Sequence, residues 1–554
     1  MGGRAAAAAA AAWQTLAELT WAAGWLVTAS LAVSLPILLG AAAYRLFLHP
    51  LASIPGPRLA ALSNAWHARH VRRGRAAELG RRLHKQYGPV VRVGPDEVWC
   101  SSKEAFDLIY NTTRGFEKTD FYYWRLHAHF HDSLDLLSER DAKRYRLQRR
   151  LIGRVYQTAN VLRHEQALDH VLDKVIERIQ GLGGAEIDLK EWMHIVAVEC
   201  LSACVLSWSP GLLRDGTDWS ASSHSYFGWR RKSVLGLFPT MAKLGLCSPW
   251  FDRLFRDLWG LTFTSPENFK SFFPDVGKQV NRRINVALKS TATKPKPKPK
   301  PNAWKKNKKK KIKAGGNGPD EAEHEARGDL LDDLIQLHRD KPDFTENYLR
   351  KMAITNFGAG HDTMASTLTS VLAMIGRHAD VQRRVAAEVR GLNDAASSEN
   401  AANVPYTRAA IREAMRLHPV ISMSLPRAAP DGGVLLHGHW IPGGTTMGCN
   451  PVALHRDQGI VGPDPDAYDP DRWLDAGAQG HRTMERYSLN WGGGARTCPG
   501  RNLAEMIVYK AVPALLSRFD VEVSVPREDE MPSYFLSMMT GVKARFLPLG
   551  ETQL

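Results

Sequence analysis

The chain has 554 residues, of which 44% are hydrophobic, and this is enough apolar material for a large buried core. Its six cysteines are scattered without a CxxC pair, which excludes a disulfide framework and a zinc ribbon. The formal net charge is +16, but eleven lysines lie between residues 291 and 313, and subtracting them leaves +5. The positive charge therefore belongs to one segment, and no nucleic-acid partner is predicted.

The first predicted element is an apolar helix over residues 21–43, after an N-terminal segment over residues 1–20. This helix contains no charged residue and is long enough to span a bilayer. Several arginines follow it, whereas one arginine and one glutamate precede it, so the C-terminal side is expected to be cytosolic. The alternative is a cleaved signal peptide ending at 41–43, but the apolar run is long for one.

Residues 44–57 are expected to form a linker that ends in a stiff hinge, Pro55-Gly56-Pro57. Residues 58–554 would then form one domain. Within it, residues 291–319 are rich in lysine, proline and glycine and are predicted to be a disordered insert.

Helices are predicted for most of the domain. The patterns indicate a hairpin of short strands over 90–100, a helix over 138–156, and helices over 161–206 with an interruption near 181–184. The segment 115–131 is aromatic and either packs into the core or faces a substrate; its candidates are Phe121, Tyr122 and Phe130.

A long helix is predicted over 344–378, with Thr345 as its N-cap. Gly358 and Gly360 lie inside it and cost about 1 kcal/mol each relative to alanine, which suggests that another body approaches the helix closely there. Asp362 and Thr363 follow as a proton-carrying pair. The alternative is a threonine hydroxyl that bonds back to the preceding turn.

The C-terminal third carries the remaining polar signals. Glu413 and Arg416 share one face of a helix predicted over 407–417, and Arg472 lies in a tight, proline-led stretch. The glycine-rich loop 491–500 holds Cys498 two residues after Arg496. A helix is predicted from this loop to about residue 519, and the amides at its start would favour a thiolate at Cys498.

These stretches, in this order, resemble the cytochrome P450 family from about residue 44 to the end. The cysteine loop is similar to the family's FxxGxRxCxG pattern, with Trp491 in place of phenylalanine. Glu413 and Arg416 match the ExxR pair, and Arg472 matches the arginine that completes it. Residues 359–363 resemble the oxygen-activating (A/G)Gx(D/E)T motif, and Arg149, four residues after Tyr145, matches a propionate-binding arginine. The linker and anchor resemble microsomal members, and other details look fungal.

The resemblance implies a fold that is mainly α with small β-sheets, in a single catalytic domain behind an N-terminal transmembrane helix. Cys498 would be the metal ligand of haem b, and Asp362 and Thr363 would be catalytic, beside a break at Gly360 that makes room for dioxygen. Glu413, Arg416 and Arg472 would be structural. The remaining cofactor-binding candidates are Arg149, Arg427, Arg496, Trp491, Gly494 and Gly500, and the substrate candidates are Phe121, Tyr122, Phe130, Phe357, Ser422 and Met538.

The activity implied is a monooxygenase that inserts one oxygen atom of O2 into a lipophilic small molecule, in secondary metabolism or detoxification. Its electrons would come from NADPH through NADPH–cytochrome P450 reductase, and its location would be the endoplasmic reticulum membrane. Two alternatives stay open at this point. One is a haem-thiolate isomerase or dehydratase that works without a reductase, and the other is a non-catalytic haem-binding membrane protein.

Overall fold

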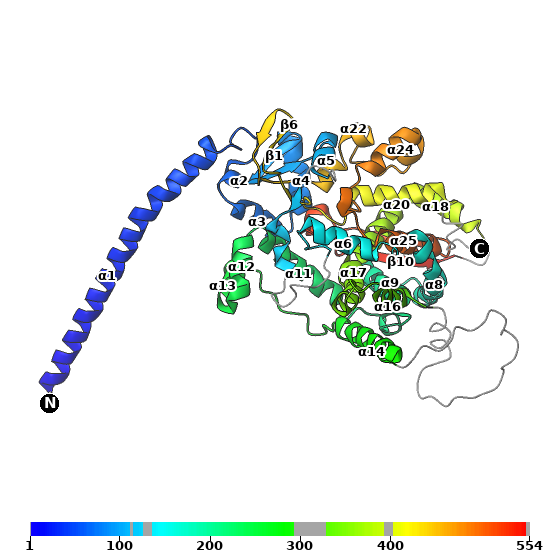
Figure 1. The fold of residues 1–554 in the computed structure, drawn as a ribbon, viewed down its shortest axis with the longest axis horizontal. Coiled ribbons are helices and arrows are strands. Elements are labelled where there is room, and N and C mark those ends of the chain that lie inside the picture. The colour runs from blue at the N-terminus through cyan, green and yellow to red at the C-terminus, as the bar shows by residue number, and fades with distance from the viewer. Residues whose placement is uncertain (1, 111–114, 126–135, 293–327, 393–402, 550–554) are drawn as a thin grey trace.

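A single helix, α1 (Gly2–Ala43), projects from the rest of the chain (Figure 1). The computed structural model describes residues 2–110, 115–125, 136–292, 328–392 and 403–549. The stretch Trp13–Leu48 contains an 18-residue window with a mean hydropathy of 2.0 and is long and apolar enough to cross a membrane. The helix begins at Gly2 and not near residue 21, because the alanines of residues 5–12 have the highest helix propensity. Residue 21 is therefore not a helix boundary.

The segment after α1 is fixed against the domain. It starts with a π-helical turn, η1 (Tyr44–Leu48), and Leu51 is fully buried. The amide of Arg92 donates to the carbonyl of Pro55 at 2.8 Å. A Cβ added to Gly56 would lie 2.3 Å from the carbonyl oxygen of Arg92. The predicted hinge is thus packed against a strand, and the glycine is needed for this close approach.

The strands of the described residues form small sheets. The largest has the order β1-β2-β8-β5-β3, with β1 (Val90–Gly94), β2 (Glu97–Cys100), β3 (Glu117–Lys118), β5 (Arg427–Ala428) and β8 (Thr446–Cys449). A second sheet has the order β4-β10-β9, with β4 (Ile187–Asp188), β9 (Phe519–Ser524) and β10 (Lys543–Pro548). The third pairs β6 (Val434–Leu436) with β7 (His439–Ile441). The hairpin predicted over 90–100 is confirmed by the antiparallel pair β1 and β2.

Helices make up most of the domain, as predicted. Before residue 293 they are α2 (Arg58–Leu62), α3 (Asn64–Arg72), α4 (Ala76–Tyr87), α5 (Lys103–Ile109), α6 (Ala142–Ile152), α7 (Thr158–Val161), α8 (Glu165–Gln180), α9 (Leu189–Leu206), α10 (Leu212–Asp215), α11 (Ala221–Gly236), α12 (Pro239–Cys247), α13 (Pro249–Leu258) and α14 (Phe273–Ala292). After residue 327 they are α16 (Leu330–Asp340), α17 (Glu346–Arg377), α18 (Ala379–Arg390), α20 (Pro405–Leu417), α21 (Pro451–Leu454), α22 (Gln458–Val461), α23 (Arg472–Asp475), α24 (Gly477–Arg486) and α25 (Arg501–Leu516).

Short 3₁₀ turns complete the described structure: η2 (Asp120–Arg125), η3 (Leu162–His164), η4 (Gly494–Arg496) and η5 (Glu528–Glu530). The helix predicted over 138–156 is observed as the shorter α6. The pair predicted around an interruption near 181–184 is observed as α8 and α9. The part of the lysine-rich insert from residue 293 to 319 lies outside the described residues.

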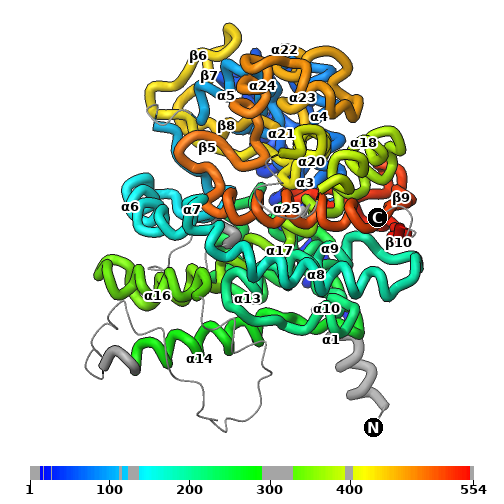
Figure 2. Tube along the Cα trace, turned by 90° about the vertical axis from the view of Figure 1, so that its right-hand side faces the viewer, coloured from blue at the N-terminus to red at the C-terminus, as the bar shows by residue number. Residues whose placement is uncertain are grey.

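Helix α17 runs through the middle of the domain, beside α9, α20 and α25 (Figure 2). The hydroxyl of Thr345 accepts a hydrogen bond from the Tyr348 amide, as expected for an N-cap. The helix is continuous from Glu346 to Arg377, so the break expected at Gly360 does not occur. A Cβ at Gly360 would lie 2.8 Å from Cδ1 of Leu201 on α9. This glycine therefore allows close packing of α9 and α17 and does not interrupt the helix.

Candidate active site

The cysteine loop, residues 491–500, makes a tight turn directly before α25. The amide of Cys498 donates to the carbonyl of Trp491 at 2.7 Å and closes the loop. Gly494 has a φ of +60°, and a Cβ there would lie 1.8 Å from the carbonyl oxygen of Tyr110. Only glycine fits this position, because a side chain would be strained and would also displace the loop from Tyr110. The loop thereby holds Cys498 just before the helix.

Cys498 is accessible to solvent, but it lies in a recess where the surrounding protein atoms desolvate its thiol. Desolvation raises the pKa of this thiol, whereas the amide of Gly500 and the positive charges of Arg149 and Arg501 lower it. A Cβ on Gly500 would lie 4.0 Å from the sulfur. An accessible sulfur that faces an amide and two guanidinium groups is suited to bind a metal as a thiolate.

One face of α17 is also accessible in the middle of the protein. Ala359 is exposed and Thr363, one turn further along, is partly exposed, whereas Phe357 and His361 are buried. Two hydrogen bonds of Tyr156 connect this helix to the start of α25. The Tyr156 hydroxyl donates to Oδ1 of Asn356 at 2.6 Å.

The second of these bonds lies beside the cysteine loop: the Tyr156 carbonyl accepts from Nδ2 of Asn502 at 2.8 Å. Burial raises the pKa of Tyr156, and the nearby Cys498 adds to this effect. The cysteine and the accessible face of α17 therefore belong to one region of the interior.

The side chains of Asp362 and Thr363 point in different directions, as neighbours in a helix do. The Thr363 hydroxyl donates to the carbonyl of Ala359 at 2.7 Å, which is the back-bond that the sequence left as an alternative. Asp362 is buried, and its Oδ2 accepts from Nε1 of Trp229 at 2.8 Å and from the hydroxyl of Ser225, both on α11. Its Oδ1 is buried and accepts no hydrogen bond.

Three arginines lie near one another beside the cysteine loop. Nη1 of Arg149 on α6 is buried and has no hydrogen-bond partner among the described residues. Arg427 is buried and donates to the carbonyl of Pro426 at 2.9 Å. Burial lowers the pKa of Arg496, and the positive charge of Arg427 lowers it further. Among the residues that the structure describes, none of the three arginines forms an ion pair with a carboxylate. The region therefore favours an anionic ligand.

Two tyrosines accompany these arginines. The guanidinium carbon of Arg496 lies 4.0 Å from the centre of the Tyr145 ring, and the Tyr145 hydroxyl donates to the carbonyl of Ala495 at 3.1 Å. Tyr122 is buried, with its hydroxyl 3.5 Å from Nη1 of Arg427. Burial raises the pKa of Tyr122, although Arg427 opposes that shift. Both phenols are therefore neutral and can only donate or accept hydrogen bonds here.

Glu413, Arg416 and Arg472 meet in a buried network. Nε of Arg416 donates to Oε2 of Glu413 and Nη2 to Oε1, both at 2.8 Å. Nε of Arg472 donates to Oε1 of Glu413 at 3.2 Å, and Nε1 of Trp473 donates to Oε2 at 2.9 Å. The remaining guanidinium donors of the two arginines reach main-chain carbonyls of residues 455–467. The network joins α20 to the segment before the cysteine loop.

The substrate candidates occupy several environments. Phe121 and Tyr122 are buried in an aromatic cluster with Phe535, and Phe357 is fully buried in the main core. Ser422 and Met538 line a cavity of about 610 Å³. Phe130 lies outside the described residues.

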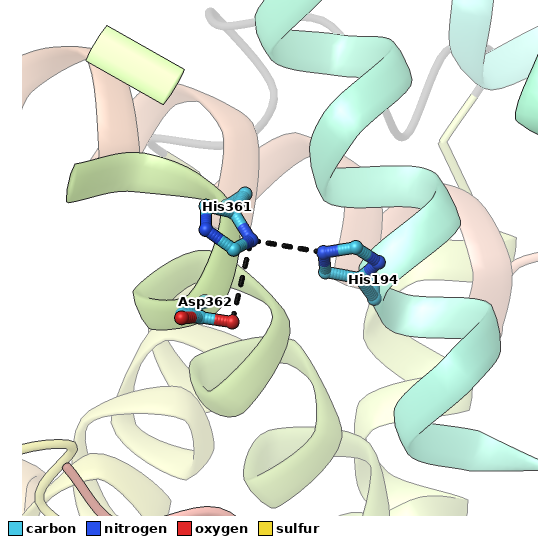
Figure 3. Close-up of side chains that lie close together, drawn as sticks. All are labelled: His194, His361 and Asp362. Carbon is cyan, nitrogen blue, oxygen red and sulfur yellow. Dashed lines mark hydrogen bonds and ion pairs between the residues drawn. The ribbon is translucent and has the colours of Figure 1, made fainter. Parts of the chain in front are cut away.

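A buried pair of histidines was not identified as functional from the sequence. Nε2 of His194 on α9 lies 2.9 Å from Nδ1 of His361 on α17, and this same Nδ1 lies 3.3 Å from Oδ1 of Asp362 (Figure 3). On its other side, Nδ1 of His194 lies 3.0 Å from Oδ2 of Asp218. No sequence signal could have found this group, because His194 and His361 are 167 positions apart.

The sequence matches known proteins along most of its length. Residues 55–546 match the family model for cytochrome P450. A cytochrome P450 monooxygenase of Sordaria araneosa, sdnT, is 49% identical over 535 residues, which cover 92% of this chain and 93% of that protein. The cytochrome P450 monooxygenase mpaDE of Penicillium roqueforti is 28% identical over 90% of this chain and 55% of its own length. The cytochrome P450 monooxygenase gsfF of Penicillium aethiopicum is 27% identical over 91% and 94%, respectively.

Proposed function

This chain belongs to the cytochrome P450 family of haem-thiolate monooxygenases, and we propose that it inserts one oxygen atom of O2 into a lipophilic small molecule of fungal secondary metabolism. Its electrons come from NADPH through a membrane-bound NADPH–cytochrome P450 reductase. The observation that carries this proposal is the accessible Cys498 sulfur in an interior region with three arginines that pair with no carboxylate of the described residues.

The residues around Cys498 fit haem b. Cys498 is the iron ligand, and Arg149, Arg427 and Arg496 bind the two propionates, for which the unpartnered Nη1 of Arg149 is a ready donor. Trp491, Gly494 and Gly500 shape the loop that approaches the porphyrin. The haem supplies the redox chemistry and the activation of dioxygen, and the protein supplies orientation and protons.

The acid–alcohol pair on α17 supplies those protons. The Thr363 hydroxyl lies on the accessible face of the helix and can donate a hydrogen bond there once it leaves the Ala359 carbonyl. Asp362 is held behind it by donors from α11. Glu413, Arg416 and Arg472 do not take part in the reaction; their buried network fixes the segment that leads into the cysteine loop.

The substrate is proposed to be lipophilic because its candidate contacts are mostly aromatic or aliphatic. Phe121, Tyr122 and Met538 lie in one cluster of buried apolar side chains. Ser422, Phe357 and Phe130 stay candidates as well, and Ser422 already donates its hydroxyl to the carbonyl of Tyr534.

The protein is proposed to be a single-pass protein of the endoplasmic reticulum, with residues 21–43 within the bilayer and residues 58–554 as the cytosolic catalytic domain. The apolar, exposed helix α1 and the arginines that follow it support this orientation. Residues 291–319 are proposed to be an insert without a role in catalysis.

The test uses the full-length protein in membranes with reductase and NADPH. We expect a red-shifted carbon monoxide spectrum typical of thiolate ligation, and an oxygenated product when extracts of the native host are supplied as substrates. Cys498→Ser should lose both, whereas Cys247→Ser, which changes another exposed cysteine, should keep both. A thiolate spectrum in the Cys498→Ser protein would contradict the proposal.

A further inference from the structure

Three buried side chains from two helices bring atoms that can bind a metal close together. His194 lies on α9, and His361 and Asp362 lie on α17. Each residue offers one ligand atom, and these atoms lie within 4.8 Å of one another (Figure 3). All three residues are at most 4% exposed. Two imidazole nitrogens and one carboxylate oxygen form a ligand set that zinc accepts in proteins.

Oδ1 of Asp362 is the atom that points most directly to a ligand. It is buried and has no hydrogen-bond partner among the described residues, although it lies 3.3 Å from Nδ1 of His361. The other oxygen, Oδ2, accepts hydrogen bonds from Trp229 and Ser225 of α11. These donors fix the carboxylate with Oδ1 directed at the histidine (Figure 3). A buried carboxylate oxygen that accepts no hydrogen bond is costly, and a metal ion would bind it.

Further contacts orient the atoms that would bind the metal. Nδ1 of His194 lies 3.0 Å from Oδ2 of Asp218, a buried residue that precedes α11. This carboxylate favours a ring proton at Nδ1, and it leaves the lone pair of His194 on Nε2, which faces His361. Histidine ligands of metals commonly face a carboxylate in this way, and carboxylate ligands are themselves hydrogen-bonded, as Asp362 is. The surroundings of the cluster therefore match those of a metal site.

The distances fit zinc after a small movement. Two atoms that each lie about 2.0–2.2 Å from one tetrahedral zinc ion are about 3.3–3.6 Å apart. The 3.3 Å between His361 and Asp362 already has this length. The 2.9 Å between the two histidine nitrogens is the length of a hydrogen bond, and it must widen by about 0.4 Å. Zinc then takes the place of the proton at Nδ1 of His361, and that ring carries its proton at Nε2 instead.

The charges in the cluster also favour a divalent cation. Asp218 and Asp362 are buried carboxylates, and within the part of the chain that is described their ion pairs are with the two histidines. Lys232 adds one positive charge near His361. While the imidazoles are neutral, this leaves one carboxylate charge uncompensated, and an uncompensated buried charge is costly. A zinc ion removes that excess of negative charge.

We propose that His194, His361 and Asp362 bind one zinc ion, and that Asp218 orients His194 for this. Three protein ligands leave the fourth position of a tetrahedral ion to water. Ser225 is partly exposed and donates to the Asp362 carboxylate, so the site lies one side chain away from solvent.

The consequence for turnover rests on the proposed function. A zinc ion bound to Oδ1 of Asp362 removes this carboxylate from the acid–alcohol pair with Thr363. Proton supply to the reaction then slows, and zinc acts as a reversible inhibitor.

The binding experiment adds zinc chloride to full-length, haem-loaded protein that carries Cys247→Ser, a change that removes an exposed thiol as a competing ligand. After excess zinc is removed by dialysis, we expect one zinc ion per protein. X-ray absorption at the zinc edge should show nitrogen and oxygen ligands and no sulfur. Less than stoichiometric zinc, or zinc bound through sulfur, would overturn the proposal.

Matched variants locate the ion. His194→Gln removes a ligand and should lose the zinc. Asp218→Asn keeps all three ligands but removes the charge that orients His194, so zinc affinity should fall by about 10–100-fold. The control is His224→Gln, which changes a half-buried histidine of α11 that contacts Ser265 and should bind zinc as the unchanged protein does. Full zinc content in His194→Gln, or unchanged affinity in Asp218→Asn, would overturn the proposal.

Turnover tests the effect on Asp362. The rate of NADPH-driven dioxygen reduction with reductase is compared with and without zinc chloride for His224→Gln and His194→Gln. We expect zinc to slow His224→Gln by a factor of about 10 or more and to leave the rate of His194→Gln unchanged. Equal inhibition of the two variants, or inhibition of neither, would overturn the inhibitory role.

The carbon monoxide spectrum of each protein, recorded without reductase, separates these results from the proposed function. Loss of the thiolate spectrum in the unchanged protein would overturn the proposed function, whereas the zinc content is measured directly and does not depend on it. Asp218→Asn provides an independent test of zinc binding when His194→Gln does not retain haem.

Discussion

Both oxygens of Glu413 accept hydrogen bonds from Arg416, and neither side chain reaches solvent. Glu413→Gln would leave the charges of Arg416 and Arg472 buried without a carboxylate, so we expect a loss of about 3–5 kcal/mol in the free energy of unfolding and poor haem retention. Asp471→Asn is the control. Its pair with Arg384 is as short but largely exposed, so the loss should be at most about 1 kcal/mol. Denaturant unfolding measures the free energy of unfolding of both variants. Equal losses in the two variants would contradict the prediction.

Replacing Gly494 by alanine should prevent the cysteine loop from closing, because the new Cβ would collide with the carbonyl of Tyr110. Gly477 is a matched control, with a φ of +62° and nothing within 4 Å of an added Cβ. Gly477→Ala should cost only the strain of the left-handed conformation, about 1–2 kcal/mol. We expect the thiolate carbon monoxide spectrum to disappear in Gly494→Ala and to persist in Gly477→Ala.

Arg149 should contribute to the retention of haem and not to the stability of the haem-free protein. Its buried Nη1 has no partner within the described residues, so Arg149→Ala removes no protein–protein bond of that atom but does remove a donor to a propionate. We expect a lower ratio of haem to protein, measured as the pyridine complex, with unfolding of the haem-free chain little changed. Arg150→Ala, which alters the exposed neighbour on α6, should leave the haem content unchanged.

The buried histidines should make the fold sensitive to acid. Burial, together with the positive charge of Arg416, lowers the pKa of His455 to about 3, and its Nε2 accepts a hydrogen bond from the Leu489 amide. Because the unfolded chain binds a proton near the ordinary pKa of 6.5, the unfolded state takes up more protons between these two values. Stability therefore falls as the pH is lowered, by about 1.4 kcal/mol per pH unit for this group.

The measurement is urea unfolding of His455→Gln and of the unchanged protein, from about pH 7 to about pH 5. The variant should show a shallower loss of stability over this range, whatever its stability at neutral pH. Parallel curves would show that His455 is not the group that titrates.

Two N-terminal deletions should separate the role of helix α1 in membrane attachment from the role of residues 44–57 in stabilising the domain. Deleting residues 2–43 removes the exposed α1 and should release a folded, haem-binding domain from the membrane fraction. Deleting residues 2–57 also removes the buried Leu51 and the Arg45 carbonyl, to which Nη1 of Arg92 donates at 2.8 Å. We expect a lower melting temperature for the longer deletion, and equal melting temperatures would contradict the docking of residues 44–57.

The sequence predicted the fold class and most elements because their signals are local. The hairpin over 90–100 and the N-cap at Thr345 each depend on a few neighbouring residues, and both are observed. The family resemblance is confirmed by the match over residues 55–546. The individual site roles stay predictions, although the structure brings Glu413, Arg416 and Arg472 together.

What the sequence could not show depends on contacts between distant segments. The hinge at residues 55–57 reads as a free linker until Arg92 is placed against it. The glycines of α17 suggested the close approach of another body, but only the structure shows that this body is Leu201 of α9. The contact between His194 and His361 has no local signal in the sequence, because a lone histidine in an apolar helix is usually only part of the core.

The close contact between Leu201 and Gly360 also determines the distance between the side chains of His194 and His361. His194 is two turns before Leu201 on α9, and His361 follows Gly360 directly on α17, so the distance between these helices determines the gap between the two imidazoles. Even a methyl group on residue 360 would separate the helices and lengthen the hydrogen bond between the two imidazoles. The absence of a side chain at residue 360 therefore sets the length of a buried polar contact between the two helices.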